Sequence, residues 1–130
     1  VHQLYPNHEY PQKEICGTTV AFLLIQAIKA EVGMNSEINE DTLGLDLVAL
    51  STITDLMPLI GLNRTFVKYG LKQIHQGKRL GLRMLALRAG VEVKDIDTYH
   101  LGYVIGPRIN AAGRIGSPLE AVKLLVSNDE

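Results

Sequence analysis

The segment GPRINAAGRIGSP, residues 106–118, is the most informative stretch of this 130-residue chain. It places Arg108 and Arg114 among small residues, with glycines on both sides. Pro107 predicts the end of a preceding helix, because proline disfavours helical geometry in the residue before it. The closing Ser-Pro pair matches the N-cap and first position of a following helix. The sequence therefore predicts helices on either side of a glycine-rich bend.

Three features of this bend favour an anionic ligand. Arginine recognises phosphate in a planar, bidentate geometry. The small residues around Gly113 would let an extended anion approach the backbone, where the N–H groups of a tight turn form an anion-binding nest. The next helix would direct the positive end of its dipole toward Arg114. These features predict phosphate binding; the alternative is an interhelical turn whose arginines pair with surface carboxylates.

Outward from the bend, apolar periodicity predicts helices and no convincing strand, so the fold class is expected to be mainly α-helical. The first helix is expected to be buried, and the β-branched run STIT weakens the second prediction. Asp97 or Thr98 is expected to cap the fifth helix. The expected helices are 17–32, 43–55, 62–76, 80–89, 98–105 and 118–127.

Composition restricts the class of protein. The chain is 46% hydrophobic and 21% charged, as in folded globular domains rather than disordered chains. A single cysteine, Cys16, allows no intrachain disulfide and fits a reducing cytoplasm. The longest apolar run, VAFLLIQAI, is far shorter than the roughly 20 residues that cross a bilayer. Because the chain begins with Val1, we expect a fragment or processed product, although a cloning choice would look the same.

The formal net charge of -1 hides two opposed blocks. The charged residues between positions 31 and 55 are all Asp or Glu, whereas those between positions 64 and 88 are all Lys or Arg. In the basic block, Lys68 and Lys72 lie one helical turn apart and could extend a positive track along a polyanion. The alternative is two solvated helix faces of different sign.

Asp55 is the candidate for metal or acid–base chemistry. It stands between apolar residues in STITDLMPL, at the expected end of a helix. Since carboxylates are rarely buried without a partner, Asp55 could be a metal ligand or general base. The alternative is an exposed residue at a helix end or a cap for the next turn. The four histidines show no metal-ligand spacing, and Cys16 is expected to be a buried structural thiol.

Three blocks of the chain together resemble the RecJ family, the single-strand-specific DNA exonucleases of the DHH phosphoesterase superfamily. The blocks are YPQKEICGTTVAFLLIQAI, DLVALSTITDLMPLIGLNRTFVKYGLKQI and LGYVIGPRINAAGRIGSPLEAVKLL. The resemblance implies that residues 1–60 form the later part of an α/β DHH phosphoesterase domain. It implies that residues 61–130 form a helical connector toward the DHH-associated domain.

The resemblance also implies a function and site residues. RecJ enzymes hydrolyse single-stranded DNA from the 5′ end with manganese or magnesium, in DNA repair and recombination. Asp55 would be a ligand of the metals, and Arg108, Asn110 and Arg114 would contact the DNA backbone or the 5′-phosphate. The amino-terminal aspartate motifs and the Asp-His-His triplet of the family are absent from the chain.

We therefore expect an internal piece of a RecJ-like nuclease that binds no metal and cuts no DNA by itself. Its partner would be single-stranded DNA rather than a membrane, its location cytoplasmic, and its exposed apolar faces could cause self-association. The rival hypothesis is a non-catalytic helical module that binds nucleic acid or a protein on a RecJ-like scaffold.

Overall fold

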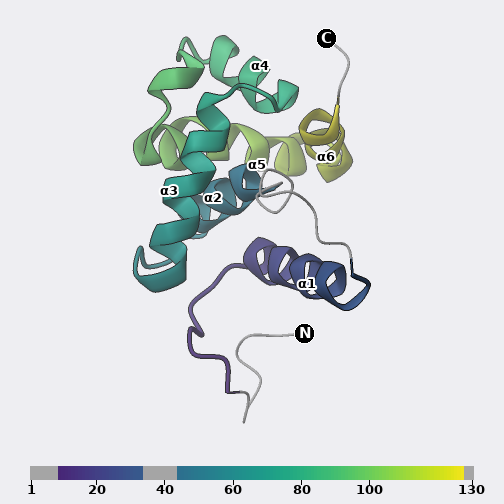
Figure 1. The fold of residues 1–130 in the computed structure, drawn as a ribbon. Coiled ribbons are helices and arrows are strands. Elements are labelled where there is room, and N and C mark those ends of the chain that lie inside the picture. The colour runs from purple at the N-terminus through teal and green to yellow at the C-terminus, as the bar shows by residue number, and fades with distance from the viewer. Residues whose placement is uncertain (1–8, 34–43, 128–130) are drawn as a thin grey trace. The chain divides into compact units, whose positions relative to one another are not determined.

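A computed structural model describes residues 9–33 and 44–127, and every regular element in these ranges is helical (Figure 1). The prediction of a mainly α-helical chain is therefore confirmed. The elements are α1 (Gly17–Glu31), α2 (Leu45–Thr54), α3 (Gly61–His75), α4 (Leu80–Arg88), the 3₁₀ turn η1 (Val93–Asp95), the π-helical η2 (His100–Ile105), α5 (Gly106–Ile115) and α6 (Pro118–Val126). No helix in the described ranges is long and apolar enough to cross a membrane.

The chain forms two compact units, Val1–Gly70 and Leu71–Glu130, which divide within α3. The predicted boundary between residues 60 and 61 is a domain assignment that comes from the family resemblance, and it stays a prediction. Part of the acidic block, namely Glu37, Glu40 and Asp41, lies outside the described residues, as do His2 and His8.

In the first unit, α1 packs against α2, and the Phe22 ring meets Phe66 edge to face with centroids 5.6 Å apart. Cys16 is buried, with its Sγ 3.1 Å from the Thr19 hydroxyl, so the expected structural thiol is confirmed. The extended segment before α1 is tied to the start of α3 through Asn63. This fully buried amide donates to the carbonyl oxygens of Glu14 at 2.7 Å and of Pro58 at 2.9 Å.

The prediction that the first helix is buried is wrong. Helix α1 forms where expected, but about half the surface of Leu24, Ile25 and Ile28 is exposed, and only Thr19 of the helix is buried. Apolar periodicity reports that a helix has a face to cover, whereas the partner that covers it is set by the tertiary fold. Among the described elements, α2 is the principal partner of α1.

In the second unit, α6 packs against both α4 and α5. The crossing with α4 is close, because Gly81 lies directly against the backbone carbonyl of Leu124. Arg79 adds a hydrogen bond, donating from Nη1 to the Leu125 carbonyl at 2.7 Å. The core of this unit contains Ile74, Leu80, Leu82, Ala86, Ile96, Leu101 and Ile105.

The predicted bend at residues 106–115 is wrong. The chain is helical from residue 98 through η2 into α5, and Pro107 lies in the first turn of α5 instead of ending a helix. Gly106 has φ -54° and ψ -50°, which is right-handed helical geometry. The break comes later, at Gly116, and Ser117 then caps α6 by accepting from the Leu119 N–H at 3.3 Å, as predicted.

Candidate functional site

Asp55 occupies the C-cap of α2 and is exposed. The Ser51 hydroxyl, one turn earlier, donates to Asp55 Oδ2 at 3.2 Å and orients the carboxylate. The helix ends in a Schellman motif, in which the Met57 N–H donates to the Thr52 carbonyl. The N–H of the residue before Met57 donates to the carbonyl of the residue after Thr52. The sequence therefore places Asp55 at a helix end by ordinary capping chemistry, with its carboxylate directed to solvent.

Leu56 follows in the left-handed conformation, with φ 54°. Glycine is the usual residue at this position because a Cβ costs about 1–2 kcal/mol there. The leucine side chain is 84% exposed, so no burial offsets the strain. A strained residue directly after a candidate ligand is a recurring feature of functional sites.

The helix that carries the arginines begins at a well-formed cap. Asp97 Oδ1 accepts from the His100 N–H at 3.0 Å and lies 2.7 Å from His100 Nδ1. The backbone N–H of His100, together with its ring, holds the pKa of Asp97 below its ordinary value. The prediction of a cap at residue 97 or 98 is thereby confirmed for Asp97.

Both arginines of the quoted segment are exposed on α5. Arg108 donates from Nη1 to the Val104 carbonyl at 2.6 Å. Neither arginine forms an ion pair with a carboxylate among the residues that the structure describes, so the surface-pairing alternative finds no partner there. At about 100° per residue, Arg108 and Arg114 point roughly 120° apart around the helix, whereas Asn110 and Arg114 share one face.

The predicted backbone nest is wrong, because a helical backbone uses its N–H groups within the helix. Gly113 is a helical residue of α5, and a Cβ added there would meet only Pro118 carbons at the ordinary contact distances of 3.8 and 3.9 Å. Side chains rather than main-chain N–H groups are therefore the anion-binding groups that α5 offers.

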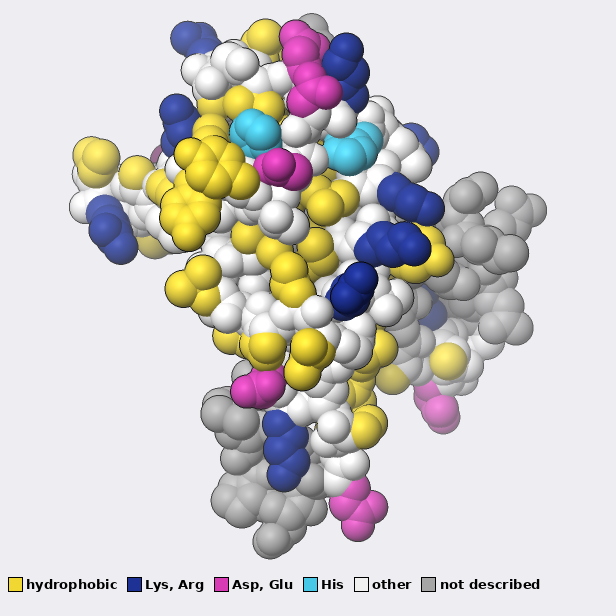
Figure 2. Space-filling model, turned by 90° about the vertical axis from the view of Figure 1, so that its left-hand side faces the viewer, with side chains coloured by type: hydrophobic (Ala, Val, Ile, Leu, Met, Phe, Trp, Pro, Cys, Tyr) yellow, Lys and Arg dark blue, Asp and Glu magenta, His cyan; other side chains and the backbone are white. Residues whose placement is uncertain are grey.

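The basic track lies along α3, where Lys68 and Lys72 are exposed at a spacing of one turn. Figure 2 shows Lys and Arg side chains following one another along the surface of the face that it presents. Such an arrangement meets a charged backbone without reading bases.

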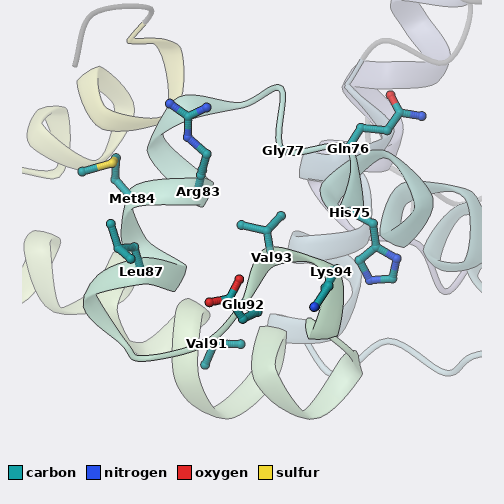
Figure 3. A pocket seen from close by; sticks show the side chains of 10 residues that line it. All are labelled: His75, Gln76, Gly77, Arg83, Met84, Leu87, Val91, Glu92, Val93 and Lys94. Carbon is teal, nitrogen blue, oxygen red and sulfur yellow. The ribbon is translucent and has the colours of Figure 1, made fainter.

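A hollow of about 470 Å³ opens in the second unit, beside α4. Its apolar lining comes from Met84, Leu87, Val91 and Val93. Figure 3 shows Val93 and Glu92 extending toward the opening and Gln76 pointing away from it. The site residues predicted from the sequence do not line this hollow.

An aromatic pair that the sequence reasoning missed lies on the same continuous helix as Arg108. The rings of Tyr99 and Tyr103 have centroids 5.2 Å apart and planes inclined by 30°. Both side chains are exposed, at 61% and 71%. Their spacing of four residues, just before the arginine segment, was the available signal.

No family model matches the chain. The single-stranded-DNA-specific exonuclease RecJ of Bacillus subtilis is 39% identical over 129 residues, which are 99% of this chain and 15% of that protein. RecJ of Dickeya dadantii is 39% identical over 128 residues, 92% of this chain and 22% of that protein. The chain resembles RecJ.

Solved RecJ structures have the same fold as this chain over the matched residues. The Thermus thermophilus RecJ in complex with Mn²⁺ matches with a TM-score of 0.76 at 37% identity, over 93% of this chain and 17% of that one. An exonuclease RecJ bound to manganese matches with a TM-score of 0.77 at 36% identity, over 97% of this chain and 30% of that one. The predicted resemblance is confirmed, and the chain spans about a fifth of the curated RecJ relatives it matches.

The RecJ structures hold Mn²⁺ or Mg²⁺, which raises the question of whether the described residues fit such an ion. Hard divalent ions take about six oxygen-rich ligands. Within residues 9–33 and 44–127, no group of three His, Cys, Asp or Glu side chains comes together. Asp55 supplies one carboxylate, which does not by itself make a metal site.

Proposed function

We propose that the chain is the part of a RecJ-type exonuclease that guides single-stranded DNA past the metal centre. The parent activity is 5′-to-3′, metal-dependent hydrolysis of phosphodiesters, acting in DNA repair and recombination. The observation that carries this proposal is 33–39% identity to curated RecJ proteins over about nine tenths of the chain. A cytoplasmic location is part of the same proposal.

In this proposal, Asp55 is one ligand of the Mn²⁺ or Mg²⁺ that such an enzyme binds, and the other ligands come from outside the described residues. The Ser51 hydroxyl, 3.2 Å from Oδ2, restricts rotation of the carboxylate. The bound metals would activate water and stabilise the leaving oxygen. The isolated chain is expected to bind DNA without cutting it.

The DNA contacts are assigned to exposed side chains on two helices. Arg108, Asn110 and Arg114 on α5 would contact the strand backbone or its 5′-phosphate, and Gly113 would leave room for the strand. Lys68 and Lys72 on α3 would extend the contact along the phosphates. These groups position the strand without reading sequence, as expected for an enzyme that degrades any single strand.

The assignment of residues 1–60 to the DHH domain and of 61–130 to the connector belongs to this proposal. Self-association is a further part of it, because Leu24, Ile25 and Ile28 leave apolar surface on α1 exposed.

The phosphate contacts are tested by the salt dependence of binding. Fluorescence anisotropy with a labelled single-stranded oligonucleotide gives the slope of log K against log salt concentration, which is about -0.7 for each phosphate neutralised on a single strand. Changing both arginines, Arg108→Gln and Arg114→Gln, is expected to make this slope shallower by about 1.4. Arg88→Gln, at an exposed position in α4, is the matched control and should leave the slope unchanged. An unaltered slope in the double variant would remove both arginines from the interface.

The role of Asp55 is tested in a protein of RecJ length that carries this sequence. Asp55→Ala is expected to abolish Mn²⁺-dependent cleavage of single-stranded DNA while leaving the circular dichroism spectrum intact. Asp95→Ala, at an exposed position in η1, is the control and should cleave normally. Cleavage by Asp55→Ala at the normal rate would exclude Asp55 from the metal site.

The rival function, a non-catalytic module on a RecJ-like scaffold, is favoured by the lack of a three-residue metal-ligand group among the described residues. It predicts nucleic-acid or protein binding with no cleavage in any longer form of the protein. Mn²⁺-dependent cleavage by that longer form would refute it.

A further inference from the structure

Two tyrosine rings stand exposed on the helix that leads into the arginine segment. Tyr99 and Tyr103 are 61% and 71% exposed, although tyrosine normally buries most of its ring. Their centroids lie 5.2 Å apart with the planes inclined by 30°, so the two rings are close neighbours at a tilt. Because most of both side chains is exposed, the pair leaves aromatic surface open to a third flat ring.

Structural roles account poorly for this pair. A contact between neighbouring aromatic side chains on an exposed helix contributes only about 0.2–0.5 kcal/mol. The edge of the His100 ring meets Tyr99 at a centroid distance of 5.7 Å, and no other ring among the described residues contacts either tyrosine. The core of this unit is supplied instead by Leu101 and Ile105, which are fully buried on the other side of the same helix.

Arg108 follows these rings on the same continuous helix, just after the π-helical turn η2. In an α-helix, Arg108 would lie about 140° around the axis from Tyr103, because five residues make well over one turn of 3.6. The i→i+5 bonding of η2 widens the turn, so five residues come closer to one full turn. The Arg108 guanidinium donates from Nη1 to the carbonyl of Val104, the residue after Tyr103, at 2.6 Å.

We propose that Tyr99 and Tyr103 form a base-stacking platform for single-stranded DNA, with Arg108 holding a phosphate of the same strand. The inference rests on the proposed function and identifies where unpaired bases would lie. Stacking on an aromatic ring needs a free base face, which a single strand offers and a duplex does not.

The platform differs from the arginines in the part of the DNA it contacts. A ring stacks on bases with little regard to sequence and with little dependence on salt, whereas a guanidinium contacts phosphate and releases counterions. An abasic oligonucleotide keeps every phosphate and removes the bases. Binding to matched normal and abasic strands therefore separates the two contributions.

The experiment measures binding of the 130-residue chain to fluorescent oligothymidylate and to an abasic strand of equal length. The double variant Tyr99→Leu, Tyr103→Leu is expected to bind oligothymidylate about tenfold more weakly and the abasic strand as the unaltered chain does. Leucine is a good helix former, so helix content should be retained, which circular dichroism checks. The control Tyr99→Phe, Tyr103→Phe keeps both rings and should retain the affinity. Arg108→Gln should weaken binding to both strands equally.

Three results would overturn the platform: an unchanged affinity of the leucine variant for oligothymidylate, an equal loss for both strands, or the same loss in the phenylalanine variant. If the first of these occurs while Arg108→Gln still makes the salt slope shallower, only the platform fails. If the chain binds neither strand in any form, the proposed DNA-binding function fails together with it.

Discussion

Replacing Gly113 by alanine tests whether residues 106–115 are a helix or the bend that glycine and proline signal in the sequence. In α5, Gly113 has no positive φ, and an added Cβ would lie 3.8 and 3.9 Å from two Pro118 carbons, which is ordinary van der Waals contact. Glycine inside a helix is about 0.8–1.0 kcal/mol less favourable than alanine. Gly113 lies in the last turn, where helices fray, so we expect Gly113→Ala to stabilise the chain by about 0.5–1 kcal/mol.

Gly81→Ala is the matched comparison, because it makes the same chemical change in another helix. A Cβ at Gly81 would lie 2.7 Å from the Leu124 carbonyl carbon and closer still to its oxygen. Neither backbone can yield without separating α4 from α6, so overpacking of about 1–3 kcal/mol outweighs the gain in helix propensity. The two alanine variants are therefore expected to shift stability in opposite directions.

Urea denaturation followed by circular dichroism measures both variants. With a slope of about 1–3 kcal/mol per molar urea, Gly113→Ala should raise the midpoint by a few tenths of a molar at unchanged slope. If Gly113→Ala instead destabilises the chain by about 1 kcal/mol or more, Gly113 occupies a turn that requires glycine, and the helical description of α5 is refuted. If Gly113→Ala stabilises the chain but weakens its binding to single-stranded DNA, the absence of a side chain at position 113 makes room for the strand.

Three further predictions concern residues outside the arginine segment. Asp97→Ala should lower the free energy of unfolding by about 1 kcal/mol through loss of the N-cap. The pKa of Asp97 is lowered in the folded state, so the stability advantage of the unaltered chain over Asp97→Asn should be present above about pH 4 and lost as the pH falls through that lowered pKa. Urea midpoints measured against pH would show this loss. Asn63→Ala should lower the free energy of unfolding by about 2–4 kcal/mol, because two hydrogen bonds of 2.7 and 2.9 Å are lost and two backbone acceptors lose their donor. A loss below about 1 kcal/mol in the same assay would contradict the burial of Asn63. Leu56→Gly should be neutral or stabilise by up to about 1 kcal/mol, since glycine removes the left-handed strain and the leucine is exposed; clear destabilisation would show that Leu56 packs against something.

Most helix positions were predictable because their signals are local. Ser117 with Pro118 marked the start of α6, and Asp97 marked the start of the helix that carries Tyr99 and Tyr103. Capping needs a side-chain oxygen at the right place and does not depend on distant residues, so the sequence alone is sufficient. The burial of α1 was not predictable in this way, because an apolar stripe does not specify its partner.

The candidate site was predictable in its residues and only partly in its geometry. The position of Asp55 at a helix end followed from periodicity and the nearby Pro58. The left-handed backbone of Leu56 carried no signal, since leucine is an unusual residue there. The sequence analysis assigned no role to the aromatic side chains, whereas the structure brings the rings of Tyr99 and Tyr103 within 5.2 Å of each other.

The Gly106–Pro107 pair misled because two effects that normally end a helix are both relieved locally. Proline disfavours helical geometry in the preceding residue mainly through that residue's N–H and Cβ, and Gly106 has no Cβ. Proline also clashes with the carbonyl four residues earlier and cannot donate a hydrogen bond. The turn that precedes Pro107 is η2, whose wider i→i+5 bonding displaces that carbonyl, and Pro107 stands in the first turn of α5, where an N–H is not required. The pair therefore converts a π turn into an α-helix without a break, and Arg108, the next residue, donates back to the Val104 carbonyl in η2.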